Sequence, residues 1–198
     1  MGAVNDIFAY LVQTFLNLYL FAMLLRFLLQ LVRADFYNPI CQFLVKITNP
    51  LVLPLRKIIP GVGGLDTASL LLAYLLQITS IAALVYIKLG GLPPIVMLMI
   101  SAAIGLIALA IKIYFFAIVA MIIVSWVAPG SRHPGVYLLF QITEPVMAPF
   151  RNIIPPLGGL DLSPIFVIIA INVVLMALGG VAEAAGVLGI TPWLGTPW

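Results

Sequence analysis

The chain has 198 residues, of which 64% are hydrophobic and only 8% carry a formal charge. Soluble domains have about 25% charged residues, and a globule of this size could not cover its surface with so few polar groups. Nine Lys and Arg against six Asp and Glu leave a net charge of only +3. Soluble enzymes, nucleic-acid-binding proteins and disordered chains are therefore excluded, and a membrane protein is indicated.

Four apolar segments are long enough to cross a bilayer as helices, which takes about 20 residues each. In chain order they are residues 7–25, with apolar character continuing to residue 32, then 67–87, 95–128 and 162–182. The third segment would form a helix of about 50 Å, too short for two spans and a turn, so it predicts one long or kinked helix. Continuous apolar runs exclude a membrane β-barrel. The fold class predicted is all-α, a polytopic membrane protein with four transmembrane helices.

The second half of the chain repeats the first at an offset of 95 residues. The segment ITNPLVLPLRKIIPGVGGLD at 47–66 aligns with ITEPVMAPFRNIIPPLGGLD at 142–161, with twelve of twenty positions identical. Two spans separate equivalent positions, so the copies have the same orientation and are related by a pseudo-two-fold axis along the membrane normal. We expect a single membrane domain over 1–198, with repeat one at 7–88 and repeat two at 102–183.

The repeated pattern T-x-P-x3-P-x-R-x-I-I-P-x2-G-G-x-D between apolar helices resembles the YggT family of bacterial integral membrane proteins. The resemblance covers nearly the whole chain. It implies a protein of the inner membrane with a loose link to osmotic stress and potassium homeostasis. Similar proteins of cyanobacteria and plastids are tied to membrane-complex maturation and to division.

Each repeat joins its two spans by a Pro/Gly-rich amphipathic link, which favours the membrane interface. Interior prolines predict that neither link is one continuous helix, so each link would be two short pieces with a bend or a shallow re-entrant hairpin. These prolines are Pro50 and Pro54 in the first link, and Pro145 and Pro149 in the second.

The links carry the candidate binding residues Arg56, Lys57 and Arg151, which could hold anionic lipid headgroups or a partner's acidic group. The alternative is that these side chains only snorkel to lipid phosphates. Asp66 and Asp161 follow Gly-Gly and precede a helix, so they are predicted as helix N-caps. A pair of cation-binding carboxylates near the axis is the alternative for these two residues.

Polar side chains within the spans are the remaining candidates, because ionisable groups at membrane depth are costly and often functional. Lys112 either reaches an interface on a tilted helix or needs a partner. Arg26 lies near enough to a basic helix end to snorkel. Asn17 and Asn172 are expected to form hydrogen bonds between helices.

Basic residues are concentrated in the links, with six there and one on the opposite side. The positive-inside rule therefore predicts that both links face the cytoplasm and that both termini face outward across the inner membrane. Trp126, Trp193 and Trp198 are expected to be interfacial anchors.

The sequence contains no catalytic constellation, metal-ligand spacing or nucleotide loop, so we expect neither an enzyme nor a cofactor. Two functions remain open. The first is a non-catalytic assembly or scaffold factor whose links engage lipid or partner proteins. The second is an oligomeric ion-permeation or transport unit with Lys112, Asp66 and Asp161 along its path. Expected partners are the anionic bilayer, membrane proteins or further copies of the chain, and no nucleic acid.

Overall fold

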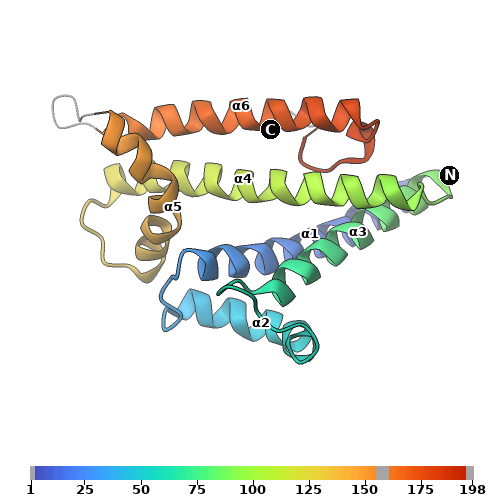
Figure 1. Ribbon diagram of the computed structural model, residues 1–198, viewed down its shortest axis with the longest axis horizontal. Coiled ribbons are helices and arrows are strands. Elements are labelled where there is room, and N and C mark those ends of the chain that lie inside the picture. Colours follow the sequence, from blue (N-terminus) through green and yellow to red (C-terminus); the bar gives the residue numbers. More distant parts are fainter. Residues whose placement is uncertain (1–2, 155–160, 195–198) are drawn as a thin grey trace.

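The computed structural model of the protein describes residues 3–154 and 161–194. These residues form six α-helices and one short 3-10 helix (Figure 1). In chain order they are α1 (Ala3–Leu31), α2 (Pro39–Arg56), α3 (Thr67–Leu89), α4 (Ile95–Val127), α5 (Pro134–Ile153), α6 (Ser163–Ala184) and η1 (Leu188–Ile190).

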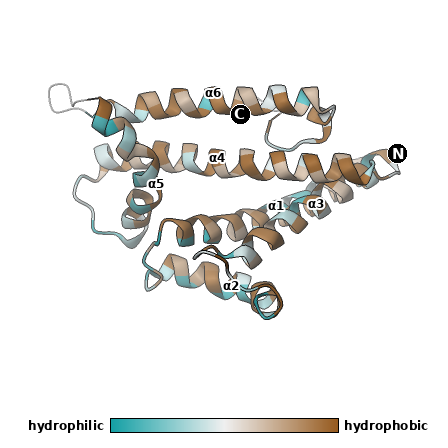
Figure 2. Ribbon diagram, viewed as in Figure 1, coloured by the Kyte–Doolittle hydropathy of each residue, from teal (hydrophilic) through white to brown (hydrophobic). Residues whose placement is uncertain are grey.

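Four of the described helices, α1, α3, α4 and α6, are long and apolar enough to cross a membrane. Figure 2 shows them mostly hydrophobic along their length, whereas hydrophilic residues gather on α2 and α5. The 33 residues of α4 form one unbroken helix, which confirms the prediction of a single long span. The all-helical membrane architecture predicted from the sequence is therefore confirmed.

Helix ends coincide with residues that stop or start a helix by local chemistry. Asp66 is the N-cap of α3, and Gly90 ends that helix with a φ of 72°. That left-handed conformation costs glycine little because it has no Cβ atom. Pro94 then precedes α4 as its N-cap residue.

The links α2 and α5 each form one helix, so the prediction that interior prolines would interrupt them was wrong. Each proline removes one hydrogen bond and strains the turn before it, which bends a helix without ending it when neighbouring groups pack around it. Figure 1 shows the first turns of α2 from the side and its last turns nearly end-on, so the predicted bend is present.

The two links begin in the same way and meet at their first turns. Asn38 caps α2 by accepting from the backbone N–H of Ile40, and His133 Nδ1 caps α5 by accepting from the N–H of Gly135. The side-chain amide of Asn38 also donates to the carbonyl of Pro134 at 2.8 Å. Both links therefore lie at one end of the molecule, called here the link end.

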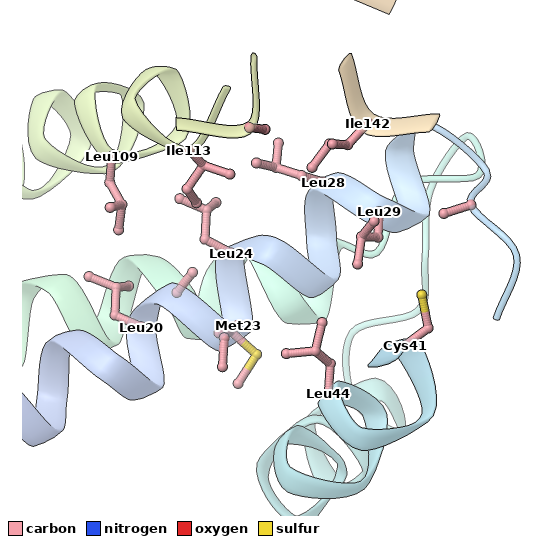
Figure 3. Close-up of a cluster of buried hydrophobic side chains, with 14 of the residues drawn as sticks. Leu20, Met23, Leu24, Leu28, Leu29, Cys41, Leu44, Leu109, Ile113 and Ile142 are labelled. Carbon is pink, nitrogen blue, oxygen red and sulfur yellow. The ribbon is translucent and has the colours of Figure 1, made fainter. Parts of the chain in front are cut away.

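Each repeat pairs its own two spans, because α1 packs against α3 and α4 packs against α6. The repeats are joined where α3 lies against α4 and where a shared core gathers residues of α1, α2, α4 and α5. Figure 3 shows Met23 of α1 beside Leu44 of α2, and Leu24 of α1 near Ile113 of α4. The apolar faces of the links thus pack partly on the spans rather than wholly on lipid.

The chain after α6 folds back between the spans. Thr191 makes a hydroxyl–hydroxyl hydrogen bond of 3.0 Å with Ser101 of α4, and Trp193 packs on the shared core. A Cβ atom at Gly105 would approach Pro192 Cδ to 3.2 Å, so this small residue allows the close contact.

Of the three tryptophans predicted as interfacial anchors, the structure describes two, and their surroundings differ. Trp193 is partly buried against the shared core, so its ring packs on protein, and its place as an interfacial anchor stays a prediction. Trp126 is 78% exposed near the end of α4. Trp198 lies outside the described residues, as do Gly158 and Gly159 of the second link.

Candidate functional site

Arg26 is buried inside the protein near the link end of α1, with 3% of its surface exposed. Its Nη1 donates to Thr48 Oγ1 at 2.5 Å and to Asn49 Oδ1 at 2.9 Å, both on α2. The expectation that Arg26 snorkels to the interface was therefore wrong. The side chain instead ties the first span to its own link, where two oxygens replace the water that its charge would lose.

Asp66 lies opposite Arg26 at the start of α3 and is as deeply buried. Its carboxylate accepts hydrogen bonds from Arg56 Nε at 3.1 Å and from Arg56 Nη2. It also accepts from the backbone N–H of Ser69 at 3.3 Å and from the Ser69 hydroxyl. One carboxylate therefore caps α3 and joins it to the last residue of α2.

The cluster of Arg26, Arg56 and Asp66, called here the clasp, holds two cations and one anion. Arg26 Nε lies 3.9 Å from Asp66 Oδ2 and is buried without a hydrogen-bond partner among the described residues. Burial opposes ionisation of Asp66, but hydrogen bonds from Arg56 and Ser69 outweigh it, so the pKa of this carboxyl lies below its ordinary value. The clasp is therefore charged at neutral pH, with one positive charge in excess.

The residues of the second repeat that are equivalent to the clasp form a cluster of different composition. The equivalent pairs are Arg56 and Arg151, Asp66 and Asp161, Thr48 and Thr143, Asn49 and Glu144, and Arg26 and Met121. Arg151 Nε donates to Asp161 Oδ2 at 3.0 Å, and its Nη1 donates to Glu144 Oε2 at 2.7 Å. This cluster holds one cation and two anions, the reverse of the clasp.

The second cluster also differs from the clasp in its exposure to solvent. The side chain of Asp161 is 42% exposed, against 2% for Asp66. The N-cap residue of α6 is Leu162, so the prediction of Asp161 as the N-cap was wrong by one residue. The Asp161 carboxylate still accepts from the backbone N–H of Ser163 at 2.9 Å. In place of a buried arginine, Met121 Sδ accepts a hydrogen bond from the Thr143 hydroxyl at 3.4 Å.

The pKa values of the second cluster follow its ion pairs. Burial opposes ionisation of Asp161, but hydrogen bonds from Ser163 and Arg151 outweigh it, so its pKa is lowered. The two carboxylates likewise outweigh burial at Arg151 and raise its pKa. Because Asp161, Glu144 and Arg151 are all part exposed, solvent screens these pairs and limits the stability that they contribute.

The polar residues within the spans do not gather into one site. Asn17 Oδ1 accepts from the Ser80 hydroxyl at 3.2 Å, which joins α1 to α3. The Asn172 amide instead donates to the Ile168 carbonyl of its own helix, so the prediction of a bond between helices was wrong for this residue. Lys112 has no hydrogen bond or ion pair with any described residue, and it lines a cavity between the repeats.

The partners of Arg26 were not predicted from the sequence. Thr48 and Asn49 belong to the repeated Ile-Thr-x-Pro motif, and the substitution of Asn49 by glutamate in the second copy parallels that of Arg26 by Met121. This paired departure from the repeat could have suggested contact. Ser69, three residues after Asp66, has the spacing of an N-cap partner.

Lys57 directly follows Arg56 and is exposed, without a hydrogen bond or ion pair among the residues described. These residues also contain no group of three or more His, Cys, Asp or Glu side chains that could hold a metal ion. Cys41 is buried and unpaired. The charged chemistry of the link end is therefore that of arginine–carboxylate pairs beside exposed lysines.

Comparison with known proteins finds one family matched twice along the chain, in agreement with the internal repeat. The CCB3/YggT family matches residues 5–87 and 100–182. An uncharacterized protein of Pseudomonas aeruginosa, PA0392, is 47% identical over 188 residues, which cover 94% of this chain and 95% of the relative. The uncharacterized protein YggT of Escherichia coli is 38% identical over 181 residues, which cover 89% and 92%.

A more distant relative is the chloroplast protein CCB3 of Arabidopsis thaliana, whose name refers to cofactor assembly of complex C. It is 35% identical over 65 residues, which cover 32% of this chain and 37% of that protein. No solved structure matches the chain with statistical significance. The family match and the full-length bacterial relatives agree, and the chain therefore belongs to the CCB3/YggT family.

Proposed function

We propose that the protein is a non-catalytic membrane assembly or scaffold factor of the bacterial inner membrane. Its link helices would face the cytoplasm and engage anionic lipid headgroups or partner proteins, with both termini outward. The observation that carries the proposal is the pairing of α2 and α5 at one end of the molecule through Asn38 and Pro134. Such a paired amphipathic surface suits a membrane interface.

The name of the Arabidopsis relative, which refers to cofactor assembly, supports this class of function. The second candidate, ion permeation, gains no such support from the described residues. Asp66 and Asp161 each form ion pairs with an arginine, so neither carboxylate is free to bind a passing cation.

The first link is the better candidate for anionic lipid. Between residues 33 and 66 lie four basic and two acidic residues, whereas two of each lie between residues 128 and 161. Arg56 and Arg151 are already paired with carboxylates, so they have less charge to offer a phosphate. Lys46 and Lys57 are exposed, and we assign the capture of headgroups mainly to them.

We expect the Lys46→Gln/Lys57→Gln protein to retain much less phosphatidylglycerol than the native chain. Each lysine near an anionic surface contributes about 1 kcal/mol, so the pair predicts a roughly 30-fold loss of binding. The measurement is native mass spectrometry of the purified protein titrated with phosphatidylglycerol, with phosphatidylcholine as the neutral reference.

Tyr137→Gln, on the exposed surface of the second link, is the matched control and should leave retention unchanged. Equal retention by the lysine variant and the native chain would contradict lipid capture by the first link. Partner capture is tested by in vivo crosslinking from the same two positions. Loss of a specific crosslinked membrane protein without loss of lipid would assign the surface to a protein partner instead.

A further inference from the structure

A cavity of about 620 Å³ lies between the two repeats. Pockets for small ligands span about 300–1,000 Å³, so its size suits a single molecule and is too small for a partner helix. It is bounded by α1, α2, α4, α5, α6 and the returning tail. Its walls are almost wholly hydrocarbon, with aromatic rings from Phe21, Phe115 and Phe116.

Lys112 is the one ionisable side chain among the described residues that line this cavity. It lies near the middle of α4, about 25 Å along the helix from Ile95. A lysine charge at such depth is costly unless an anion or other polar group faces it. No described residue forms a hydrogen bond or ion pair with it.

The described helices around the cavity carry no free carboxylate near the level of Lys112. Asp6 lies in the first turn of α1, and Glu183 lies next to the last residue of α6. Glu144 of α5 is bonded to Arg151. Charge complementarity therefore points to an anion that the ligand itself brings.

The residues that line the cavity indicate the chemistry of the rest of the ligand. Besides Lys112 its lining includes Ile40 and Gly135, which lie in the first turns of the two links. Trp193 lines it as well, and its indole Nε1 is buried without a hydrogen-bond partner among the described residues. Two polar donors in an otherwise apolar space fit one acceptor group on a hydrocarbon chain.

We propose that the cavity binds a long-chain carboxylate, a free fatty acid, with its carboxylate at Lys112 and its chain along the apolar walls. A charge-assisted hydrogen bond between ammonium and carboxylate is about twice as strong as a neutral one. A carboxylate should therefore bind more tightly than an alcohol of the same chain length. The site is separate from the headgroup surface of the first link, so either can fail without the other.

The test uses the full chain in detergent with cis-parinaric acid as the fluorescent probe, displaced by oleate or by oleyl alcohol. We expect oleate to bind at least about tenfold more tightly than oleyl alcohol, and Lys112→Met to abolish the difference. Ile107→Met, a lipid-facing change on the same helix, should leave both affinities unchanged.

The wild-type comparison decides the matter even if Lys112→Met does not fold. Equal affinity for oleate and oleyl alcohol would overturn the proposal, as would equal displacement by phosphatidylglycerol, which would indicate a phospholipid. The position is tested in a Trp126→Phe/Trp198→Phe chain, where Trp193 is the remaining tryptophan. Dibrominated stearate should quench its fluorescence, and absence of quenching would place the ligand elsewhere.

Discussion

Replacing Asp66 with asparagine should destabilise the protein by about 3 kcal/mol, although asparagine caps helices as well as aspartate does. The amide can still accept from Ser69, so the cap survives. The substitution removes the negative charge that lies between Arg26 and Arg56. The side chain of Arg26 is almost fully buried. A buried guanidinium without a counter-charge is the costly consequence. The measurement is the Tm in detergent, which should fall by about 10 °C.

Asp161→Asn is the matched control in the second repeat. Asp161 is 42% exposed, and Arg151 keeps Glu144 as a partner after the substitution, so the cost should stay below about 1 kcal/mol. Equal losses from the two substitutions would contradict the distinction between the clasp and its exposed counterpart.

The same ion pairs make the thermal stability of the native protein depend on pH in the acid range. The pKa of Asp66 is lower in the folded chain than in the unfolded one, so its stabilisation is present above about pH 4 and is lost as the pH falls through the folded value. We therefore expect the Tm to fall progressively as the pH drops below about 4. The fall in Tm should be smaller in the Asp66→Asn protein, in which protonation of Asp161 accounts for the remaining fall.

Arg26→Met should have opposite effects in two backgrounds. In the native chain it removes the hydrogen bonds to Thr48 and Asn49, which predicts a loss of about 2 kcal/mol. In the Asp66→Asn chain it removes the uncompensated buried charge and should restore about 1–2 kcal/mol. Methionine is the residue that the second repeat has at this position, so its shape is compatible with the helix packing.

A double-mutant cycle of Tm or urea unfolding measures this coupling. Met121→Leu is the control for packing at the equivalent position and should change stability by less than about 1.5 kcal/mol. If the Arg26→Met/Asp66→Asn protein were less stable than Asp66→Asn alone, Arg26 would stabilise the fold independently of Asp66, and the clasp would not act as a unit.

The spans and the duplication could be predicted from the sequence because each rests on a local or periodic signal. Residues 95–128 are too short for two spans, and α4 accordingly runs unbroken from Ile95 to Val127. The prolines of the links are equally visible, but their effect depends on packing. Pro50 lies inside α2 without ending it, and Leu44 and Val52 on either side of it are buried.

The clasp could be predicted only in part, because its geometry depends on contacts across the fold. The equivalence of Asp66 and Asp161 is plain in the repeat, yet one is buried and the other exposed. Arg26 lies 22 residues from Thr48, and no periodicity links them. Likewise, the chain after α6 is held to α4 by the hydrogen bond between Thr191 and Ser101, which are 90 residues apart. The cavity that the tail helps to close was therefore beyond sequence reasoning.

The orientation of the two links in the membrane is tested most directly by cysteine labelling in cells. In a Cys41→Ala chain, single cysteines replace Lys57 in the first link, Asn152 in the second, and Lys88 and Glu183 at the opposite ends of the spans. A membrane-impermeant maleimide added outside should label the Lys88→Cys and Glu183→Cys proteins and spare the two link variants until the inner membrane is opened. Labelling of Lys57→Cys and Asn152→Cys from different sides would contradict parallel repeats, and labelling of both from outside would reverse the proposed orientation.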